Sequence, residues 1–433
     1  MLSTTFFLNK KEECGCKKDI SALIVIIGIS DFSPGRAILL SKIGNLIGYR
    51  TKIITNRPIY LKNDENVIKR DIISLDIPAL GYNSILGRLF FYLLFSFLCL
   101  LKLLRIIRKE RYKRVFIIAR HPYPFSVILS LIAKWLLKSS REIIVIADIT
   151  DLWPESLMFM SDSIISKIVI RVGLILNRFF YKRIDGALTH NVPFKKYIQE
   201  VYLEGLNKII FVIPHLVDTS LFKPIQKEHA IQILRKMAYL NEEESKVLCA
   251  RIVFGYVGLI SHTIGSKALL EFVDVVKNDP RFALLIVGEG SFKRTLEDKI
   301  RKENIQCVYI KDTIPHEKIP LVINATDIGI VTSFPNSKHF SSKYCMPKKF
   351  IEYCACAKPI IYIGYSAVIS SYIRQYSAGI SIEKPANREE LLNVIHEIIA
   401  NYSDLSKNAS QLSQKFSCEH WLNEFKKFLS SFT

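Results

Sequence analysis

The chain has 433 residues, of which 49% are hydrophobic and 23% are charged. That length suffices for two or three ordinary domains, and the composition excludes a disordered or low-complexity scaffold. A formal net charge of +20 accompanies a mean hydropathy of +0.21. A chain that is both basic and hydrophobic favours an anionic membrane surface, and only then nucleic acid, as its partner.

The charge is unevenly distributed along the chain. Residues 1–224 contain 33 Lys and Arg against 18 Asp and Glu, so they carry +15 of the net charge. The remainder has the composition of an ordinary globular domain. The first half is therefore expected to face something anionic.

The cysteines and the amino terminus point to a cytosolic protein. Nine cysteines are scattered without a C-x-x-C pair, which favours reduced thiols over a disulfide framework or a zinc site. Cys354 and Cys356 lie two apart on an expected helix and cannot share a metal. The first apolar run, at 20–30, follows a mixed-charge stretch without a cleavage site, so it indicates a buried strand and not a signal peptide.

Apolar, β-branched runs alternate with helical patterns throughout the chain. In the first half they fall at 20–30, 51–55, 114–124, 142–154, 186–191 and 208–218. In the second half they fall at 251–259, 282–290, 306–312, 327–334, 359–364 and 378–383. Repeated strand–helix–strand units predict an α/β fold of two Rossmann-like, doubly wound parallel-sheet domains that face each other across a cleft.

The domain limits follow from this pattern. We expect a first domain at 1–222, a linker with one helix at 223–250, a second domain at 251–415, and a final helix at 416–433 that crosses back to the first domain.

Two basic and apolar segments interrupt the pattern. The uncharged run 89–101 leads into a tract rich in Lys and Arg. It is too short for a membrane-spanning helix, so we favour an in-plane membrane anchor over a buried core helix. The segment 163–183 places Lys167, Arg171 and Arg178 along one stripe, and there a core helix and a membrane surface are equally good interpretations.

Six motifs occur in an order that resembles the GT-B glycosyltransferases, above all the retaining family 4 and its surface-polysaccharide members. They are ADITDLWPES (147–156), IPHLVDTSLFKP (213–224), GYVGL (255–259), LLIVGEGSFKRTLE (284–297), VINATDIGIV (322–331) and MPKKFIEYCACAKPIIY (346–362). The resemblance implies a GT-B fold and a nucleotide-sugar donor of the UDP or GDP type. It also implies catalysis that requires no bound metal and no other cofactor.

Donor binding is expected in the second domain. Glu352 matches the family's second glutamate of an E-x7-E motif, which binds the ribose hydroxyls, while the first glutamate's position is Tyr344. Lys343 and Lys349 flank the start of the same helix, where cations and free N–H groups suit a diphosphate.

Further donor contacts are expected on the glycine-containing loops of that domain. Gly258 ends its first strand, where a side chain would crowd a phosphate, and Gly288 follows the second strand. Relatives place an Arg and a Lys after the first glycine, at the positions of Leu259 and Ile264. Two nearby residues are candidate substitutes, His262 and Lys267.

The first domain supplies the candidate catalytic and acceptor residues. His121 follows a strand and is either a contact to the transferred sugar or a turn residue. Asp148 and Asp151 flank the end of the next strand, and one of them is expected to orient the acceptor hydroxyl or act as a base. Gly35 and Arg36 begin a helix and are candidates for an acceptor phosphate.

Together these features predict a retaining glycosyltransferase, peripheral on the cytoplasmic face of the cell membrane, with a lipid-linked or glycan acceptor. Two alternatives stay open. One is a non-catalytic, membrane-bound GT-B subunit, because Tyr344, Leu259 and Ile264 occupy positions that are charged in relatives. The other is a nucleotide-sugar epimerase. Nucleic-acid binding is not expected, since the basic stretches contain long aliphatic residues and no recognised module.

Overall fold

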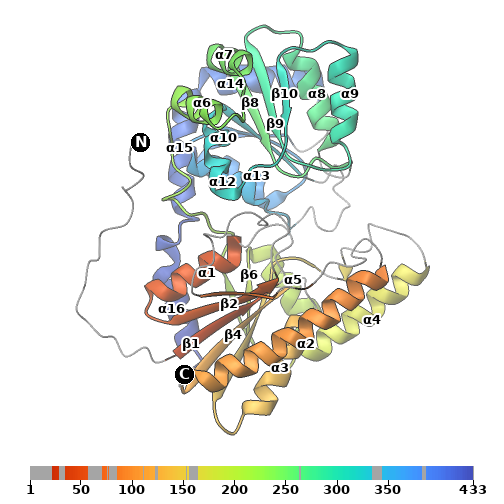
Figure 1. Cartoon of the computed structure of the whole chain (residues 1–433), viewed down its shortest axis with the longest axis vertical. Helices are drawn as coiled ribbons and strands as arrows, with labels where there is room; N and C mark the ends of the chain where they lie inside the picture. Colours follow the sequence, from red (N-terminus) through yellow and green to blue (C-terminus); the bar gives the residue numbers. More distant parts are fainter. Residues whose placement is uncertain are drawn as a thin grey trace.

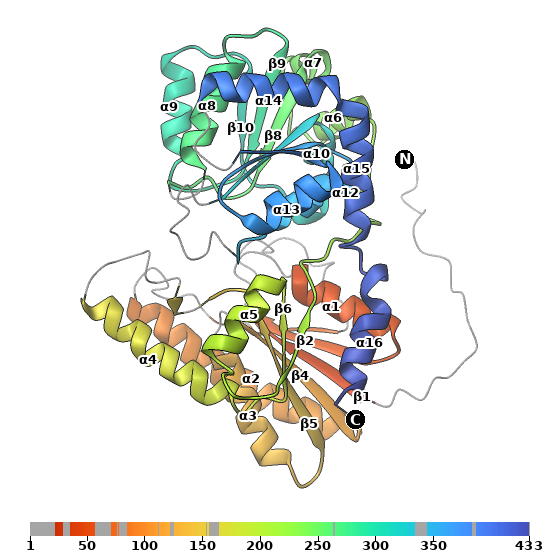
Figure 2. The ribbon, with the colours of Figure 1, turned by 180° about the vertical axis from the view of Figure 1, so that it is seen from behind.

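The computed structural model of the chain describes residues 22–28, 35–56, 71–75, 77, 85–110, 112–121, 125–152, 154–155, 164–262, 265–333, 344–382 and 387–432. These residues form two α/β domains that lie one above the other in Figure 1, and Figure 2 shows them from behind.

A seven-stranded parallel sheet forms the centre of the first domain. Its strands lie in the order β3-β2-β1-β4-β5-β6-β7, with every adjacent pair parallel. The strands are β1 (Ala22–Ile27), β2 (Arg50–Asn56), β3 (Ile72–Leu75), β4 (Arg114–His121), β5 (Glu142–Ile149), β6 (Gly186–Thr189) and β7 (Ile209–Val212). Every side chain of β1 is buried, as a continuous apolar run requires when helices cover both faces of a sheet.

Helices pack on both faces of this sheet. They are α1 (Gly35–Leu46), α2 (Ile85–Lys109), α3 (Phe125–Leu137), α4 (Ile164–Tyr181) and α5 (Val192–Val201). One hydrophobic core includes Leu40 and Ile43 of α1. The core on the other face includes Phe95 of α2 and Val127 of α3.

The second domain has a six-stranded parallel sheet in the order β10-β9-β8-β11-β12-β13. The strands are β8 (Ile252–Val257), β9 (Phe282–Val287), β10 (Val308–Lys311), β11 (Ile328–Thr332), β12 (Ile360–Ile363) and β13 (Gly379–Ile382). In both domains the strand order runs outward in two directions from the first strand, which confirms the predicted pair of doubly wound sheets.

Helices also surround the second sheet. They are α6 (Lys227–Lys236), α7 (Glu242–Ala250), α8 (Ser266–Val276), α9 (Lys293–Lys302), α10 (Ile319–Asn324), α12 (Lys348–Ala355), α13 (Ala367–Tyr376), α14 (Arg388–Ala400) and α15 (Tyr402–Gln414), with 3₁₀ turns η4 (His316–Lys318) and η5 (Glu419–Trp421).

The stretch 223–250 differs from the expected linker with one helix. It forms two helices, α6 and α7, whose apolar residues Ile231, Leu234 and Leu248 are buried in the core of the second domain. Lys227 at the start of α6 also forms an ion pair of 2.5 Å with Asp327. The stretch is therefore an integral part of the second domain.

The last helix, α16 (Leu422–Ser430), lies against the first domain (Figure 2). Phe425, Phe428 and Leu429 are buried in the core beside α1. The ring of Phe428 stacks on Phe211 of β7 with centroids 5.1 Å apart. Among the described residues, the first strand, β1, and the last helix, α16, thus belong to the same domain.

Helix α2 is longer than the uncharged run 89–101 suggested. Among the described residues it contains one window, Phe90–Lys109, that is long and apolar enough to cross a membrane by length and composition. The expected length of the apolar helix is therefore wrong, and length alone does not disfavour a span. One face of α2 nevertheless packs into the core, where Phe95, Cys99 and Leu103 are fully buried.

Candidate active site

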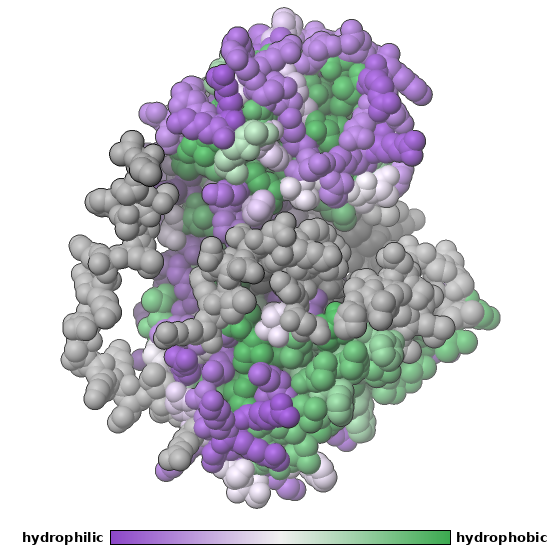
Figure 3. Space-filling view, in the orientation of Figure 1, coloured by the Kyte–Doolittle hydropathy of each residue, from purple (hydrophilic) through white to green (hydrophobic). Residues whose placement is uncertain are grey.

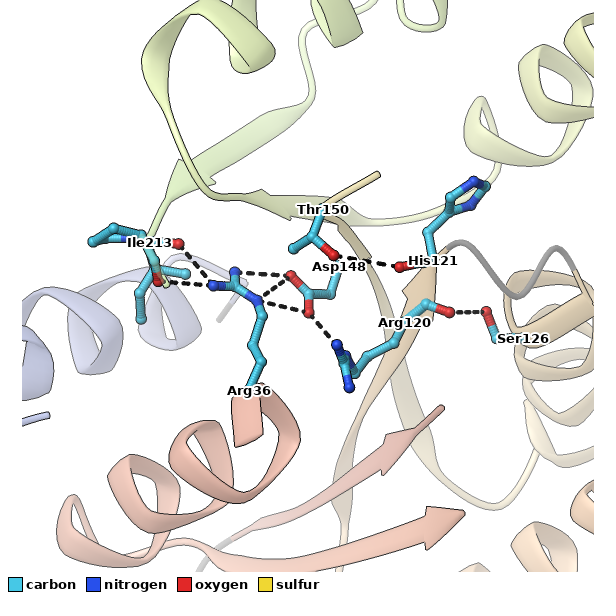
Figure 4. Close-up of polar contacts among 8 residues, drawn as sticks. Arg36, Arg120, His121, Ser126, Asp148, Thr150 and Ile213 are labelled. Carbon is cyan, nitrogen blue, oxygen red and sulfur yellow. Dashed lines mark hydrogen bonds and ion pairs between the residues drawn. The ribbon is translucent and has the colours of Figure 1, made fainter. Parts of the chain in front are cut away.

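A buried ion pair occupies the carboxyl ends of the first-domain strands (Figure 4). Arg36 donates from Nε to Asp148 Oδ2 at 3.0 Å and from Nη2 to Oδ1 at 2.9 Å. Its Nη1 donates to the carbonyls of Ile213 and Pro214. Arg36 is 4% exposed and Asp148 is 0% exposed. This geometry joins α1 to β5 and to the segment after β7, and it does not present either group to an acceptor.

A second arginine approaches the same carboxylate. Arg120 lies on β4, and its Nε is 3.5 Å from Asp148 Oδ2 (Figure 4). Arg120 was not among the predicted site residues, because the neighbouring His121 is the more conspicuous residue of this strand end. A signal was available, since a cation that directly follows the buried run of a central strand is unusual.

His121 is held by a tyrosine of α4. The imidazole is buried, and its Nδ1 lies 2.7 Å from the hydroxyl of Tyr181. Burial, together with the nearby Glu155, raises the pKa of Tyr181 well above its usual value, so the phenol stays protonated and can donate to Nδ1. The carboxylate of Glu155 in turn accepts hydrogen bonds from Tyr197 and Tyr202. The predicted role of His121 in sugar contact stays a prediction.

Asp151 is the candidate acid that faces the second domain. It is exposed just after β5, and its Oδ1 accepts a hydrogen bond of 2.9 Å from the backbone N–H of Leu152. Loss of hydration against the surrounding protein raises the pKa of its carboxyl above the usual value. The hydrogen bond from Leu152 lowers this pKa in part, and the charge of Glu155 raises it further. Its own charge contributes to the raised pKa of Cys345 in the second domain, after the larger effect of burial. Of the two predicted aspartates, Asp151 is thus the one open to a ligand.

Two loops of the second domain pack backbone against backbone. Gly288 has φ +154°, and a Cβ there would lie 1.9 Å from the carbonyl oxygen of Gly258. A Cβ at Gly290 would lie 2.0 Å from the carbonyl oxygen of Ile260. Hydrogen bonds from Gly258 N to Val287 O and from Ile260 N to Glu289 O, both 2.9 Å, join the two loops. Only glycine permits so close an approach.

A lysine lies over this glycine pair. A Cβ on Gly258 would be 3.1 Å from Lys349 Nζ. The same Nζ lies 3.9 Å from the centre of the Tyr256 ring, a cation–π contact that fixes its position. The structure therefore brings together the predicted donor residues Gly258, Gly288 and Lys349, and Lys349 belongs to the first turn of α12.

Glu352 is a buried residue of the same helix, α12, about one turn after Lys349. Its Oε1 lies 3.0 Å from His316 Nε2 and 3.3 Å from Lys348 Nζ. Burial alone would raise the pKa, but the Lys348 charge and the hydrogen bond from His316 lower it to about 2. The carboxylate is therefore ionised at physiological pH, and His316 donates from Nε2. His316, which was not predicted, also packs its ring on Phe222 with centroids 5.3 Å apart.

The remaining donor candidates are more loosely placed. His262 is exposed and packs edge-on against Phe292, and Lys267 is exposed in the first turn of α8. Among the described residues no contact joins either of them to Lys349 or Glu352. Lys343 and Ile264 lie outside the described residues. Gly35 is the first residue of α1, and Leu259 is exposed.

Tyr344 forms a contact between the domains. Its carbonyl accepts hydrogen bonds from His190 Nε2 at 3.0 Å and Asn191 Nδ2 at 2.9 Å. Its ring packs on Phe194 and Tyr197 of α5. The position of the family's first glutamate is thus used here for packing against the first domain.

Within the part of the chain that the structure describes, no group of three or more His, Cys, Asp or Glu side chains could hold a metal ion. Cys354 and Cys356 are free and buried. Burial raises the pKa of Cys356 to about 12, so this thiol stays protonated.

Comparisons with known proteins bear on the fold and on the second domain. Residues 242–416 match the family model of glycosyl transferases group 1. The chain is similar to sucrose-phosphate synthase from Thermosynechococcus elongatus, with a TM-score of 0.64 and 16% identity over 95% of this chain and 99% of that chain. It is also similar to HepE of Anabaena in complex with UDP, with a TM-score of 0.62 and 15% identity over 95% and 100% of the two chains. A third similar structure is a glycosyltransferase from Rickettsia africae, with a TM-score of 0.60 and 17% identity over 94% and 97%. No curated protein sequence matches the chain.

The two parallel Rossmann-like sheets and these structural neighbours define a protein of the GT-B fold. Residues 242–416, most of its second domain, match the glycosyl transferases group 1 model, which supports glycosyl transfer as the class of activity.

Proposed function

We propose that the protein is a retaining glycosyltransferase that moves a sugar from a nucleotide diphosphate donor, of the UDP or GDP type, to a lipid-linked or glycan acceptor. The observation that carries the proposal is the geometry of Glu352. Its carboxylate is ionised and only 6% exposed, and the described residues engage it through Oε1. The Oε2 atom can then accept hydrogen bonds from ribose hydroxyls, a strong interaction for a charged acceptor.

The neighbouring groups suit the diphosphate of such a donor. Lys349 lies beside Gly258, where the backbone is open to a close approach. A cation in the first turn of α12 adds to the positive end of the helix dipole. In the transfer step the bond from the anomeric carbon to the diphosphate oxygen breaks, and its electron pair leaves with the diphosphate. The acceptor oxygen bonds to the anomeric carbon, and its proton passes to the departing diphosphate or to water. Lys349 would stabilise the charge that develops on the diphosphate.

Asp151 is the first-domain group that we propose to orient the acceptor hydroxyl. It is exposed after β5. Its charge contributes to the raised pKa of Cys345, which belongs to the second domain. The burial of Asp148 makes it the less suitable candidate. HepE of Anabaena, a protein of the same fold, is known in complex with UDP, which supports the nucleotide class of the donor.

A nucleotide-binding panel tests the donor site. UDP, GDP and their sugar derivatives are titrated calorimetrically against the wild type, Glu352→Gln and Glu352→Ala. Loss of a charge-assisted hydrogen bond of about 1.5–3 kcal/mol predicts affinity that is weaker by about 10- to 100-fold. Glu397→Gln, an exposed glutamate on α14, is the matched control and should bind like the wild type. Equal affinities of the Glu352 variants and the wild type would refute this donor site.

Turnover separates the proposal from its alternatives. A transferase releases nucleoside diphosphate only when an acceptor is present, and its product keeps the donor's anomeric configuration. An epimerase converts the nucleotide sugar without an acceptor. A non-catalytic subunit gives no turnover with any donor on membrane lipid extracts, and that result would sink the enzymatic proposal.

We further propose that the first domain binds the surface of an anionic membrane at its cytoplasmic face. Helices α2 and α4 run side by side in both ribbon views (Figures 1 and 2). The outer stripe of α4 consists of exposed apolar residues: Ile164, Ile168, Val172, Ile175 and Phe179. A matching exposed stripe on α2 consists of Phe90, Leu93, Phe97 and Leu101. Figure 3 shows a continuous hydrophobic area on this side of the domain.

The charge beside these stripes favours an anionic lipid bilayer as the occupant. Lys167, Arg171 and Arg178 lie on α4, and Arg108 and Lys109 end α2. Apolar side chains flanked by cations are the composition of a surface that inserts shallowly among anionic headgroups. The packing of the inner face of α2 in the core favours in-plane contact over a span.

Vesicle sedimentation tests this surface. Wild-type protein should sediment with phosphatidylglycerol vesicles more than with phosphatidylcholine vesicles, and less so at high salt. The double substitution Ile168→Ser/Ile175→Ser on α4 should release it. Met237→Ser, which removes an exposed apolar residue of the second domain, is the control. Unchanged sedimentation of the α4 variant would exclude this surface as the membrane contact.

A further inference from the structure

The positive charge of Arg120 is only partly neutralised by the surrounding residues. Its side chain is 17% exposed, and its closest acid is Asp148, 3.5 Å from Nε. Asp148 already accepts three hydrogen bonds from Arg36. At 3.5 Å the contact with Asp148 is an ion pair and a poor hydrogen bond, and among the residues that the structure describes no other group accepts from Arg120, whose Nε is buried without a hydrogen-bond partner.

The charges of this cluster do not cancel. Two guanidinium groups, Arg36 and Arg120, share the single carboxylate of Asp148. Burial lowers the pKa of Arg120, the charge of Asp148 raises it in part, the charge of Arg36 lowers it again, and the close contact with the Asp148 carboxylate raises it somewhat, so that the net shift is downward. An uncompensated charge that has lost much of its hydration is costly, so buried cations are normally paired. A guanidinium left with free donors therefore indicates a position prepared for an anion.

Arg120 lies at the carboxyl end of a central strand of the first sheet. It is the penultimate residue of β4, and its stem packs over Gly28, where a Cβ would lie 3.2 Å from Arg120 Cβ. The pKa of His215 is sensitive to the charges around its ring. Its pKa is lowered by burial, and further by positive groups that include Arg120 of the first domain and Lys348 of the second. Lys348 is the residue that contacts Glu352, so the imidazole of His215 lies within the electrostatic reach of cations from both domains.

A second unpaired polar atom lies in the same region. His190 is 4% exposed, and its Nδ1 is buried without a partner among the described residues. Its Nε2 contacts the carbonyl of Tyr344 in the second domain. The centres of the His190 and His215 rings are 5.0 Å apart. His190 thus carries a ring nitrogen without a hydrogen-bond partner at a contact between the two domains.

We propose that Arg120 binds a phosphate group of a substrate held between the domains. This inference rests on the proposed glycosyl transfer and names a further binding residue for it. A guanidinium presents a planar pair of N–H donors that matches two phosphate oxygens, which makes arginine the preferred partner for this group. The phosphate comes from one of two sources, the diphosphate of the donor or the phosphate of a lipid-linked acceptor.

The test compares Arg120→Gln and Arg120→Lys with the wild type in calorimetric titrations of three probes. Inorganic pyrophosphate represents the shared chemistry, UDP the donor, and farnesyl phosphate in detergent micelles the acceptor, with farnesol as its uncharged counterpart. Arg114→Gln is the matched control, because Arg114 begins the same strand and pairs with Glu142 on the surface. Loss of charge-assisted hydrogen bonds predicts affinity weaker by about 10- to 100-fold for Arg120→Gln. Arg120→Lys keeps the charge and should lose less.

The outcomes separate the two sources. Weakened pyrophosphate and UDP binding with unchanged farnesyl phosphate binding assigns Arg120 to the donor. Weakened pyrophosphate and farnesyl phosphate binding with unchanged UDP and farnesol binding assigns it to the acceptor. Pyrophosphate binding that depends on Arg120, in a protein that binds no nucleotide sugar, would sustain this inference while refuting the proposed function.

Thermal unfolding without ligand distinguishes a binding role from a structural one. Because Arg120 is poorly compensated, Arg120→Gln should unfold within about 3 °C of the wild type. Unchanged binding of all three phosphate probes would overturn the inference, and so would unchanged binding together with a large loss of stability, which would make Arg120 a structural partner of Asp148.

Discussion

Replacing Gly288 by alanine should disrupt the backbone contact beneath the donor site. Gly288 has φ +154°, which costs a residue with a side chain about 1–3 kcal/mol. The added Cβ would lie 1.9 Å from Gly258 O, so one loop must move by more than about 1 Å to restore normal contact. That movement weakens the hydrogen bonds at Gly258 and Ile260, each worth about 1 kcal/mol. The free energy of unfolding should fall by about 3–5 kcal/mol in total.

Thermal unfolding followed by circular dichroism measures this loss. For a domain of this size a few kcal/mol corresponds to a midpoint lower by about 10 °C. Gly205→Ala is the matched control, because Gly205 has φ +73° and nothing within 4 Å of an added Cβ. It should lose only the conformational part, about 1–2 kcal/mol. Equal losses in the two variants would refute the argument from backbone contact. Gly288→Ala should also bind UDP more weakly, because the loop beside Lys349 is displaced.

Three further variants test other parts of the account. Asp148→Asn leaves the guanidinium groups of Arg36 and Arg120 without a counter-charge, so urea denaturation should show a loss of about 3–5 kcal/mol, and a loss below 1 kcal/mol would contradict the buried pair. The pKa of Glu352 is lowered to about 2, below its unfolded value, so its stabilisation is complete above about pH 4.5 and declines as the pH falls towards 2. The difference in unfolding free energy between the wild type and Glu352→Gln should thus be constant from pH 8 to about pH 5 and shrink below it; a difference that changes near neutral pH would contradict the assigned charge. Phe428→Ala removes a buried ring that stacks on β7 and should cost about 3 kcal/mol, whereas a cost under 1 kcal/mol would mean that α16 contributes little to the first domain.

The sheets were predictable because their strands are continuous apolar runs. Parallel strands covered on both faces leave this pattern in the sequence, and β1 and β9 are buried at every position. The short edge strand β3 is only half-buried, so it carries no such run. The interpretation of 223–250 as a linker failed for a related reason. The many charged residues of α6 and α7 concealed a narrow apolar stripe that includes Ile231 and Leu234.

The proximity of the candidate site residues was predictable where they are close in sequence. Lys349 and Glu352 lie on one helix, and glycines after two strands mark Gly258 and Gly288. The partners of the first-domain residues are distant in the chain and could not be inferred. Arg36 pairs with Asp148 across 112 positions.

Other contacts of the site also depend on tertiary structure alone. His316 meets Glu352 across 36 positions, and Tyr344 meets His190 across 154. No local pattern specifies such pairs, because they arise only when the strand ends are brought together by the fold.

Acceptor-dependent release of nucleoside diphosphate tests the central claim most directly. The wild type, Glu352→Gln and Glu397→Gln are incubated with UDP- and GDP-sugars, with and without a membrane lipid extract. The wild type and Glu397→Gln should release nucleoside diphosphate from at least one donor, and only when the extract is present. Glu352→Gln should remain folded and release much less. Equal release by Glu352→Gln and the wild type would contradict the account, as would the absence of release with every donor.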